Sequence, residues 1–287
     1  MQGFRNVLFP VDMSDNCTAA VPFVEAMVRK LEANLTLLHV LEMPPAYFTD
    51  WCGYMSMVDT QGIINSRQNE FDSYLRDRFS GLHVDRVMFE GDPAQAIIKF
   101  TQEQATDLIM MPTYGYGVFR HLLLGSVTAK VLHEALCPVW TGVHIENTPA
   151  VSTSIERIMC AVDLTKSSVA TMRFADQFAK EFNAKLWLVH AVPGPEVGPE
   201  KYFDSDFQIF LEAEARKTIA KMQQEERIDA QLCLGTGDVA NVVQQAALHH
   251  EANLVVIGRG HATRLLGPLR TNVHAVIRKS PCPVISV

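Results

Sequence analysis

The sequence has no long hydrophobic run and no excess of basic residues. None of its apolar stretches reaches the ~18 residues that a membrane-spanning helix requires. Its 287 residues include 25 lysines and arginines against 32 aspartates and glutamates, which leaves a formal net charge of −7. A nucleic-acid-binding domain usually carries a basic patch, and anionic membranes attract basic segments. We therefore expect neither nucleic acid nor a membrane as a partner.

Cysteine is sparse, and no two cysteines form a CxxC pair. The six cysteines are scattered through the chain, at Cys17, Cys52, Cys137, Cys160, Cys233 and Cys282. In a chain of this length, such spacing is typical of reduced thiols rather than of a disulfide framework. The first residues also lack the basic start and the apolar run of a signal peptide. We expect a soluble, cytoplasmic protein.

Several catalytic and phosphate-binding motifs are missing as well. The sequence contains no Gly-Lys-Ser/Thr P-loop and no complete GxGxxG motif. His249 and His250 are adjacent, so they do not share a helical face and are poorly placed to bind one metal ion. His39 and His190 end matching apolar segments, and we expect both to be packed or hydrogen-bonded. No catalytic residue and no metal site is predicted.

What the sequence does contain is an internal repeat. Four pairs of similar segments occur in the same order in both halves, at offsets of 151, 151, 146 and 145 residues. The pairs are 6–14 with 157–165, 35–40 with 186–191, 91–93 with 237–239, and 137–139 with 282–284. Ordered self-similarity of this kind indicates a duplicated structural unit. We predict two domains, 1–147 and 148–287, with the boundary in the polar stretch 146–149.

Short apolar runs and helical periodicity alternate within each half. In the first half we expect strands at 7–11, 35–40, 82–89, 108–111 and 139–143, and helices at 19–31, 61–79, 93–104 and 126–134. The second half repeats this order from Ile158 to Val287. Strands that alternate with helices favour parallel sheets. We predict an α/β chain of two tandem, doubly wound, Rossmann-like domains, whose ligands bind beyond the carboxyl ends of the strands.

Asp12 follows the first expected strand at such a carboxyl end. Its carboxylate could accept hydrogen bonds from ribose hydroxyls or from an adenine amino group. It could equally cap the following helix, a task for which Ser14 competes. Position alone leaves these two roles open.

A glycine-containing loop follows the fourth expected strand. It runs from Pro112 through Gly115 and Gly117 to Gly125 and Ser126, where a helix begins. Backbone N–H groups at a helix start are unpaired and favour an anion, and glycine allows a phosphate to approach closely. Ser126 could donate its hydroxyl to the phosphate and also cap the helix. The alternative is a plain glycine turn followed by a serine cap.

In its repeat, its strand-end aspartate and its glycine-containing loop, the chain resembles the tandem-domain, UspA-like members of the universal stress protein family. That family's signature is Gly-x2-Gly-x9-Gly-Ser/Thr, in a domain whose first strand ends in aspartate. The first half supplies Gly115, nine residues, and then Gly125-Ser126, together with Asp12. It departs from the signature at Pro112, which stands where the first glycine belongs. The resemblance covers nearly the full length of both halves and implies an adenine nucleotide α-hydrolase-like fold.

The resemblance also implies a ligand and a set of site residues. The expected ligand is ATP, or AMP or ADP, with Mg²⁺ as its usual companion ion. The residues framing adenine and ribose would be Pro10, Val11, Asp12 and Val40; those around the phosphates would be Gly115, Gly125, Ser126 and Val127, with Pro112 and Gly117 on the same loop. The resemblance further implies that the last strands of the two halves pair antiparallel, which makes an internal pseudo-dimer. Whether two chains form a homodimer is left open.

The second half carries a degenerate phosphate motif. Gly258 matches the first glycine of the signature, but Arg270-Thr271 stands where Gly-Ser belongs. The arginine could bind phosphate as a cation, or its side chain could fill the pocket. We expect a weakened or lost phosphate site there, although Asp163 is retained and a nucleoside could still fit.

The function expected from these observations is that of a stress-response regulator that binds an adenine nucleotide in its first domain. At most, slow ATP hydrolysis is anticipated. The alternatives are a nucleotide-free structural or interaction module, which the changes at Pro112 and Arg270 favour, and a weak ATPase.

Overall fold

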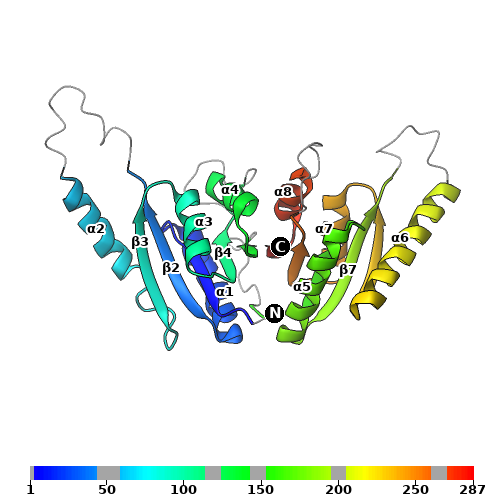
Figure 1. The fold of residues 1–287 in the computed structure, drawn as a ribbon, viewed down its shortest axis with the longest axis horizontal. Helices are drawn as coiled ribbons and strands as arrows, with labels where there is room; N and C mark the ends of the chain where they lie inside the picture. Colours follow the sequence, from blue (N-terminus) through cyan, green and yellow to red (C-terminus); the bar gives the residue numbers. More distant parts are fainter. Residues whose placement is uncertain (1–2, 44–58, 114–123, 143–152, 195–204, 260–269) are drawn as a thin grey trace, which may run out of the picture. The chain divides into compact units, whose positions relative to one another are not determined.

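The computed structural model describes residues 3–43, 59–113, 124–142, 153–194, 205–259 and 270–287. In these segments the chain has ten strands and eight helices, which form two compact units. The first unit holds β1 to β4 and α1 to α4, and the second holds β5 to β10 and α5 to α8 (Figure 1). The expected domain boundary at 147/148 lies outside the described residues. None of the described helices is both long enough and apolar enough to cross a membrane.

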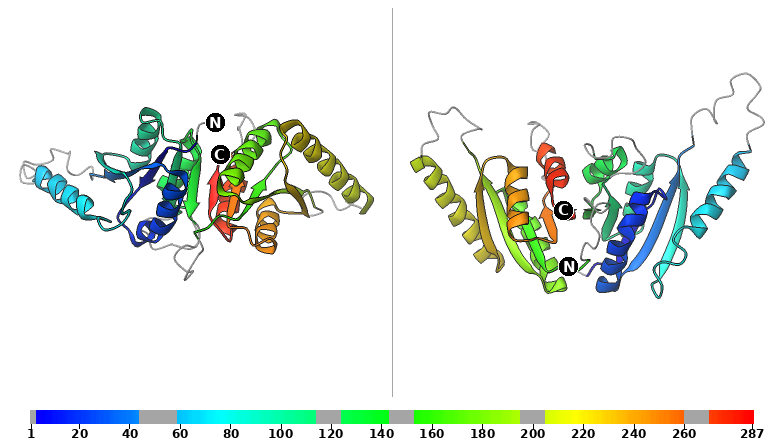
Figure 2. Two further views of the ribbon diagram at one scale, coloured as in Figure 1. Left: turned by 90° about the horizontal axis from the view of Figure 1, so that it is seen from below. Right: turned by 180° about the vertical axis from the view of Figure 1, so that it is seen from behind.

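The first unit is a parallel sheet with helices on both faces. Its elements are β1 (Asn6–Pro10), α1 (Asp15–Leu31), β2 (Asn34–Leu41), α2 (Thr60–Ser73), β3 (Val84–Glu90), α3 (Pro93–Glu103), β4 (Leu108–Pro112) and α4 (Ser126–Glu134). The strand order is β3-β2-β1-β4, and every pair is parallel. Helices α1 and α2 cover one face, and α3 and α4 cover the other (Figure 2). The strand order therefore reverses between β1 and β4, where a doubly wound sheet opens a crevice for a ligand.

The second unit repeats this arrangement and adds one strand. Its elements are β5 (Val139–Gly142), β6 (Arg157–Ala161), α5 (Lys166–Phe182), β7 (Lys185–Val192), α6 (Ser205–Glu226), β8 (Gln231–Thr236), α7 (Val239–His249), β9 (Leu254–Ile257), α8 (Arg270–Lys279) and β10 (Val284–Ser286). The order is β5-β10-β9-β6-β7-β8. Only the β5–β10 pair among these is antiparallel, with Ile285 opposite Trp140. The expected antiparallel pairing of the two final strands is thus confirmed.

The predicted elements are present, with two shifted helix ends. Helix α1 begins at Asp15 rather than at residue 19, because Ser14 caps it, and α2 ends at Ser73 rather than at 79. Leu75 and Phe79 beyond α2 both have positive φ, at 56° and 59°, which a continuing α-helix does not allow. Helix α3 starts as expected at Pro93, with Asp92 accepting a hydrogen bond from the backbone N–H of Gln95.

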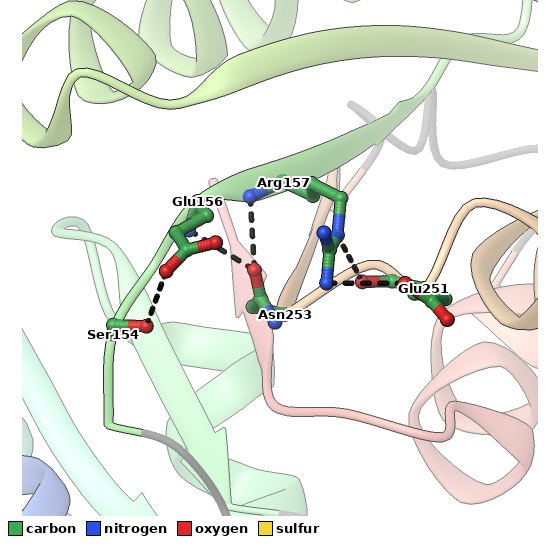
Figure 3. A network of polar contacts seen from close by, with 5 residues as sticks. All are labelled: Ser154, Glu156, Arg157, Glu251 and Asn253. Atoms are coloured by element: carbon green, nitrogen blue, oxygen red, sulfur yellow. Dashed lines mark hydrogen bonds and ion pairs between the residues drawn. The ribbon is translucent and has the colours of Figure 1, made fainter.

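In each unit, one polar side chain accepts hydrogen bonds from two backbone N–H groups at the start of the central strand. Asn253 Oδ1 accepts hydrogen bonds from the backbone N–H groups of Glu156 (3.0 Å) and Arg157 (2.9 Å), as Figure 3 shows. The Arg157 guanidinium in turn donates to the Glu251 carbonyl oxygen. In the first unit, Asp107 makes the equivalent pair of bonds, to the N–H groups of residues 5 and 6. Both halves thus use one short side chain to accept hydrogen bonds from the first N–H group of the central strand and from the N–H group just before it.

Replacing Asn253 with alanine should destabilise the protein by about 1–3 kcal/mol, because two backbone N–H groups lose their acceptor. Replacing it with aspartate keeps the accepting oxygen, as Asp107 does in the first unit, and should cost less than half as much. Urea unfolding of both variants checks this expectation. Equal losses for the two variants would contradict it, because the shared oxygen would then have no stabilising role.

Candidate functional site

Asp12 lies just beyond β1, where the strand order of the first unit reverses. We call this place the switch point. The carboxylate Oδ1 accepts hydrogen bonds from the Ser14 backbone N–H (2.9 Å) and from the Cys17 thiol (3.0 Å). Met13, between Asp12 and Ser14, has φ 60°, a left-handed conformation that turns the chain sharply into α1. Burial, and then the nearby Asp12 charge, raise the pKa of the Cys17 thiol far above its ordinary value. The thiol therefore stays protonated and keeps donating to Asp12.

The structure separates the two roles considered for Asp12. Ser14 is the N-cap of α1, and its Oγ accepts a hydrogen bond from the Cys17 backbone N–H at 3.3 Å. Asp12 orders the turn through Oδ1, while its second oxygen, Oδ2, has no hydrogen-bond donor among the described residues. The side chain is half-buried. One carboxylate oxygen thus holds the turn, and the other is able to accept hydrogen bonds from a ligand.

A buried histidine fixes the backbone immediately before Asp12. His39 on β2 is 7% exposed, and its Nδ1 lies 2.9 Å from the Val11 carbonyl oxygen. Since a carbonyl only accepts, Nδ1 carries the proton, and the buried Nε2 has no hydrogen-bond partner among the described residues. His190 makes the same contact with Val162 in the second unit, at 2.8 Å. The expectation that both histidines are packed or hydrogen-bonded is confirmed.

The amino end of α4 provides the second part of the site. Gly125 is its N-cap, and no side chain of the described residues caps the helix. The expectation that Ser126 caps α4 is wrong: Ser126 is the first helical residue, and its side chain is exposed. The N–H groups of Ser126, Val127 and Thr128 have no acceptor in the part of the chain that the structure describes. An uncapped first turn of this kind presents donors and the positive end of the helix dipole.

Two hydrogen bonds hold this helix end against β4. The Gly125 N–H donates to the Thr113 carbonyl oxygen at 3.0 Å, and the Thr128 hydroxyl donates to the Pro112 carbonyl oxygen at 3.2 Å. Because β4 pairs directly with β1, both parts of the site belong to neighbouring strand ends. Gly115 and Gly117 lie outside the described residues.

The remaining predicted site residues lie on the strands that frame this switch point. Pro10 and Val11 are buried at the end of β1, where the Val11 N–H donates to the Leu38 carbonyl oxygen at 2.8 Å. Val40 lies near the carboxyl end of the adjacent strand β2 and is half-buried. The predicted residues that the structure describes therefore belong to the carboxyl ends of β1, β2 and β4 and to the start of α4.

Pro112 has a packing counterpart that the sequence analysis missed. In the second unit the matching residue is Gly258, where a Cβ would come within 2.7 Å of Thr171 Oγ1 on α5. The repeat offset that pairs Asp12 with Asp163 pairs Thr171 with Ala20, a smaller residue on α1. Both neighbours are buried, at 4% and 0% exposed. The first unit thus combines a larger residue at the strand end with a smaller residue on the helix, and the second unit has the reverse combination.

The corresponding aspartate of the second unit, Asp163, accepts more hydrogen bonds than Asp12 does. Asp163 Oδ1 accepts from the Thr165 N–H (3.0 Å), the Thr165 hydroxyl (2.6 Å) and the Ser168 hydroxyl. Burial alone would raise the pKa of Asp163, but the hydrogen bonds from Ser168 and Thr165 hold it below its ordinary value. Ser168 occupies the repeat position of Cys17. The side chains of Arg270 and Thr271 lie outside the described residues, so the expected loss of the second phosphate site stays a prediction.

Comparison with known proteins places this chain in a family. The sequence profile of the Universal stress protein family matches the chain twice, over residues 3–141 and 154–287. The chain belongs to this family. Its two matches correspond to the two halves of the internal repeat, so the tandem arrangement inferred from the sequence is confirmed.

Two curated relatives in the family each align with 47% of the chain. The universal stress protein of Methanothermobacter thermautotrophicus is 31% identical over 144 residues, which cover 93% of that protein. Universal stress protein MJ0577 of Methanocaldococcus jannaschii is 24% identical over 153 residues, again 93% of its length. Among solved structures, a universal stress protein from Archaeoglobus fulgidus covers 99% of this chain and 97% of its own, with a TM-score of 0.70 and 20% identity. That likeness supports the tandem α/β fold.

Proposed function

We propose that this universal stress protein binds ATP or a related adenine nucleotide in its first unit and acts as a cytoplasmic stress-response regulator. The observation that carries the proposal is the pairing of two complementary groups at one switch point. Within the described part of the chain, Asp12 offers an Oδ2 acceptor that no donor contacts, and the start of α4 offers three N–H donors that no group caps. A nucleotide has matching parts: hydroxyl and amino donors on its nucleoside, and acceptor oxygens with negative charge on its phosphates.

The same two groups predict an order of affinities. The start of α4 interacts with negative charge, so ATP should bind more tightly than ADP, and ADP more tightly than AMP. Adenosine should bind weakly, because it engages the Asp12 side alone. Mg²⁺ would enter this site with the phosphates as a companion of ATP and not as a resident ion of the protein.

Calorimetric titration of nucleotide-stripped protein with ATP, ADP, AMP and adenosine tests the proposal. One ATP per chain is expected, and at about 100 times the Kd it should stabilise the protein by about 2.7 kcal/mol. Two molecules per chain would mean that the second unit also binds. Absence of heat together with an unchanged melting temperature would overturn the proposal in favour of a nucleotide-free interaction module. Phosphate release above background would identify a weak ATPase.

A further inference from the structure

A cysteine and a histidine meet at the edge of the second unit. Cys233 Sγ lies 3.1 Å from His250 Nε2. Cys233 is on β8, which pairs with β7 and with no other strand of the described residues, and His250 is the C-cap residue of α7. Both side chains are partly exposed. The pair therefore joins a nucleophilic sulfur to a base at a place that small molecules in solution can reach.

A third side chain packs against the imidazole. The Trp187 ring on β7 lies 5.3 Å from the His250 ring, centroid to centroid, at an interplanar angle of 30°. The indole N–H of Trp187 donates at 2.9 Å to Gln231 Oε1, on the residue directly opposite it in β8. A nucleophile within hydrogen-bonding reach of a base, with a further group that holds the base, is the arrangement that activates a weak nucleophile.

These residues are specific to the second unit. At the positions of Trp187, Cys233 and His250, as aligned by strand register and by the helix C-caps, the first unit has Thr36, Val87 and Gln104. The shared fold therefore forms without a thiol, an imidazole or an indole at this edge. A requirement of the fold does not explain their joint presence in the second unit.

The electrostatic surroundings keep both groups neutral until they react. Burial raises the pKa of the Cys233 thiol. Burial, and then the neighbouring His249, lower the pKa of the His250 imidazole. At neutral pH the thiol thus keeps its proton, and the imidazole has a lone pair to receive it. Reaction of this sulfur consequently depends on transfer of the proton to His250 as the new bond forms.

We propose that Cys233 is a modification site for small peroxides, with His250 as its general base. As Sγ attacks one oxygen of hydrogen peroxide, the S–H proton passes to His250 Nε2 and the O–O bond breaks. The departing hydroxide takes that proton from the imidazolium and leaves as water. The sulfur, oxidised by two electrons, becomes a sulfenic acid, and the peroxide is reduced by two electrons.

The test measures the oxidation rate of each cysteine in the reduced, full-length protein. Hydrogen peroxide is added, sulfenic acid is trapped with a dimedone reagent, and each cysteine-containing peptide is quantified by mass spectrometry. Cys137, which is also partly exposed, serves as the internal reference, and Cys17, Cys160 and Cys282 are buried. We expect Cys233 to react at least about tenfold faster than Cys137, since a positioned base accelerates proton transfer by that much or more.

Matched variants separate base assistance from simple exposure. His250→Gln keeps a polar side chain, the one that the first unit has at Gln104, but cannot take the proton; the Cys233 rate should fall at least about tenfold. His249→Gln removes the neighbour that lowers the His250 pKa but keeps the base, so the Cys233 rate should not fall below about half of the wild-type rate. An unchanged rate in His250→Gln, an equal loss in His249→Gln, or a wild-type Cys233 no faster than Cys137 would each overturn the proposal. The last comparison needs no variant and holds even if a substitution impairs folding.

Discussion

Replacing Asp12 with asparagine should lower the affinity for ATP by about 10- to 100-fold while the protein keeps its fold. Asparagine retains the Oδ1 acceptor that holds the Ser14 N–H and the Cys17 thiol. Its second terminal atom is an amide nitrogen, which donates where Oδ2 accepts. A hydrogen bond to a charged group contributes about 1.5–3 kcal/mol, and a ligand donor would now face another donor. Calorimetric titration of the two proteins with ATP gives the comparison.

The matched control is Asp163→Asn in the second unit. Asp163 follows β6 as Asp12 follows β1, and its Oδ1 already accepts hydrogen bonds from Thr165 and Ser168. If the first unit holds the nucleotide, this variant should bind ATP as tightly as the wild type. A loss in Asp163→Asn with no loss in Asp12→Asn would assign the ligand to the second unit and contradict the prediction.

Replacing Phe178 with alanine should produce the largest loss of stability, about 3–5 kcal/mol. Phe178 is 0% exposed on α5 and lies between the rings of Phe174 and Phe182, at 5.6 and 4.6 Å. Alanine would remove the ring from both contacts and leave a cavity in a close-packed core. The change in the urea unfolding midpoint measures the effect, provided that the slope of the transition is unchanged.

Two variants calibrate this loss. Phe178→Met should cost less than about 1.5 kcal/mol, since methionine is large, flexible and fills irregular space; the first unit has Met27 at the repeat position. Phe210 on α6 is 57% exposed, so Phe210→Ala should change stability by no more than about 0.5 kcal/mol. If Phe178→Ala costs no more than Phe210→Ala, the aromatic stack on α5 does not stabilise the second unit as its burial indicates.

Much of the candidate site could be located from the sequence because it depends on local patterns. A buried apolar run followed by Asp12, and a glycine before a helix at Gly125, are signals carried within a few residues. Which residue of each pattern caps the helix could not be predicted. Whether Ser14 or Asp12 caps α1, and whether Gly125 or Ser126 caps α4, depends on which residue is the last with an extended backbone, and neighbouring cap-forming residues do not reveal this in the sequence.

Other features stayed hidden because their partners are distant in the chain. One unit has a large residue at the strand end and a small one on the helix, and the other unit has the reverse. The residues concerned are Pro112 and Ala20 in the first unit and Gly258 and Thr171 in the second, and the members of each pair are more than eighty residues apart in the chain. Repeat alignment could have paired Ala20 with Thr171, but the direction of the Thr171 side chain is visible only in the fold.

By itself the sequence determined the duplication, the alternation of strands and helices, and the position of Asp12 at a strand end. Each of these follows from spacing along the chain, which the sequence records directly. Tertiary structure decided which Asp12 oxygen holds the turn, that Gly125 rather than Ser126 is the N-cap of α4, and that Cys233 faces His250. The physical reason is that hydrogen bonds and side-chain contacts depend on how elements pack against one another, and packing brings together atoms that spacing along the chain leaves apart.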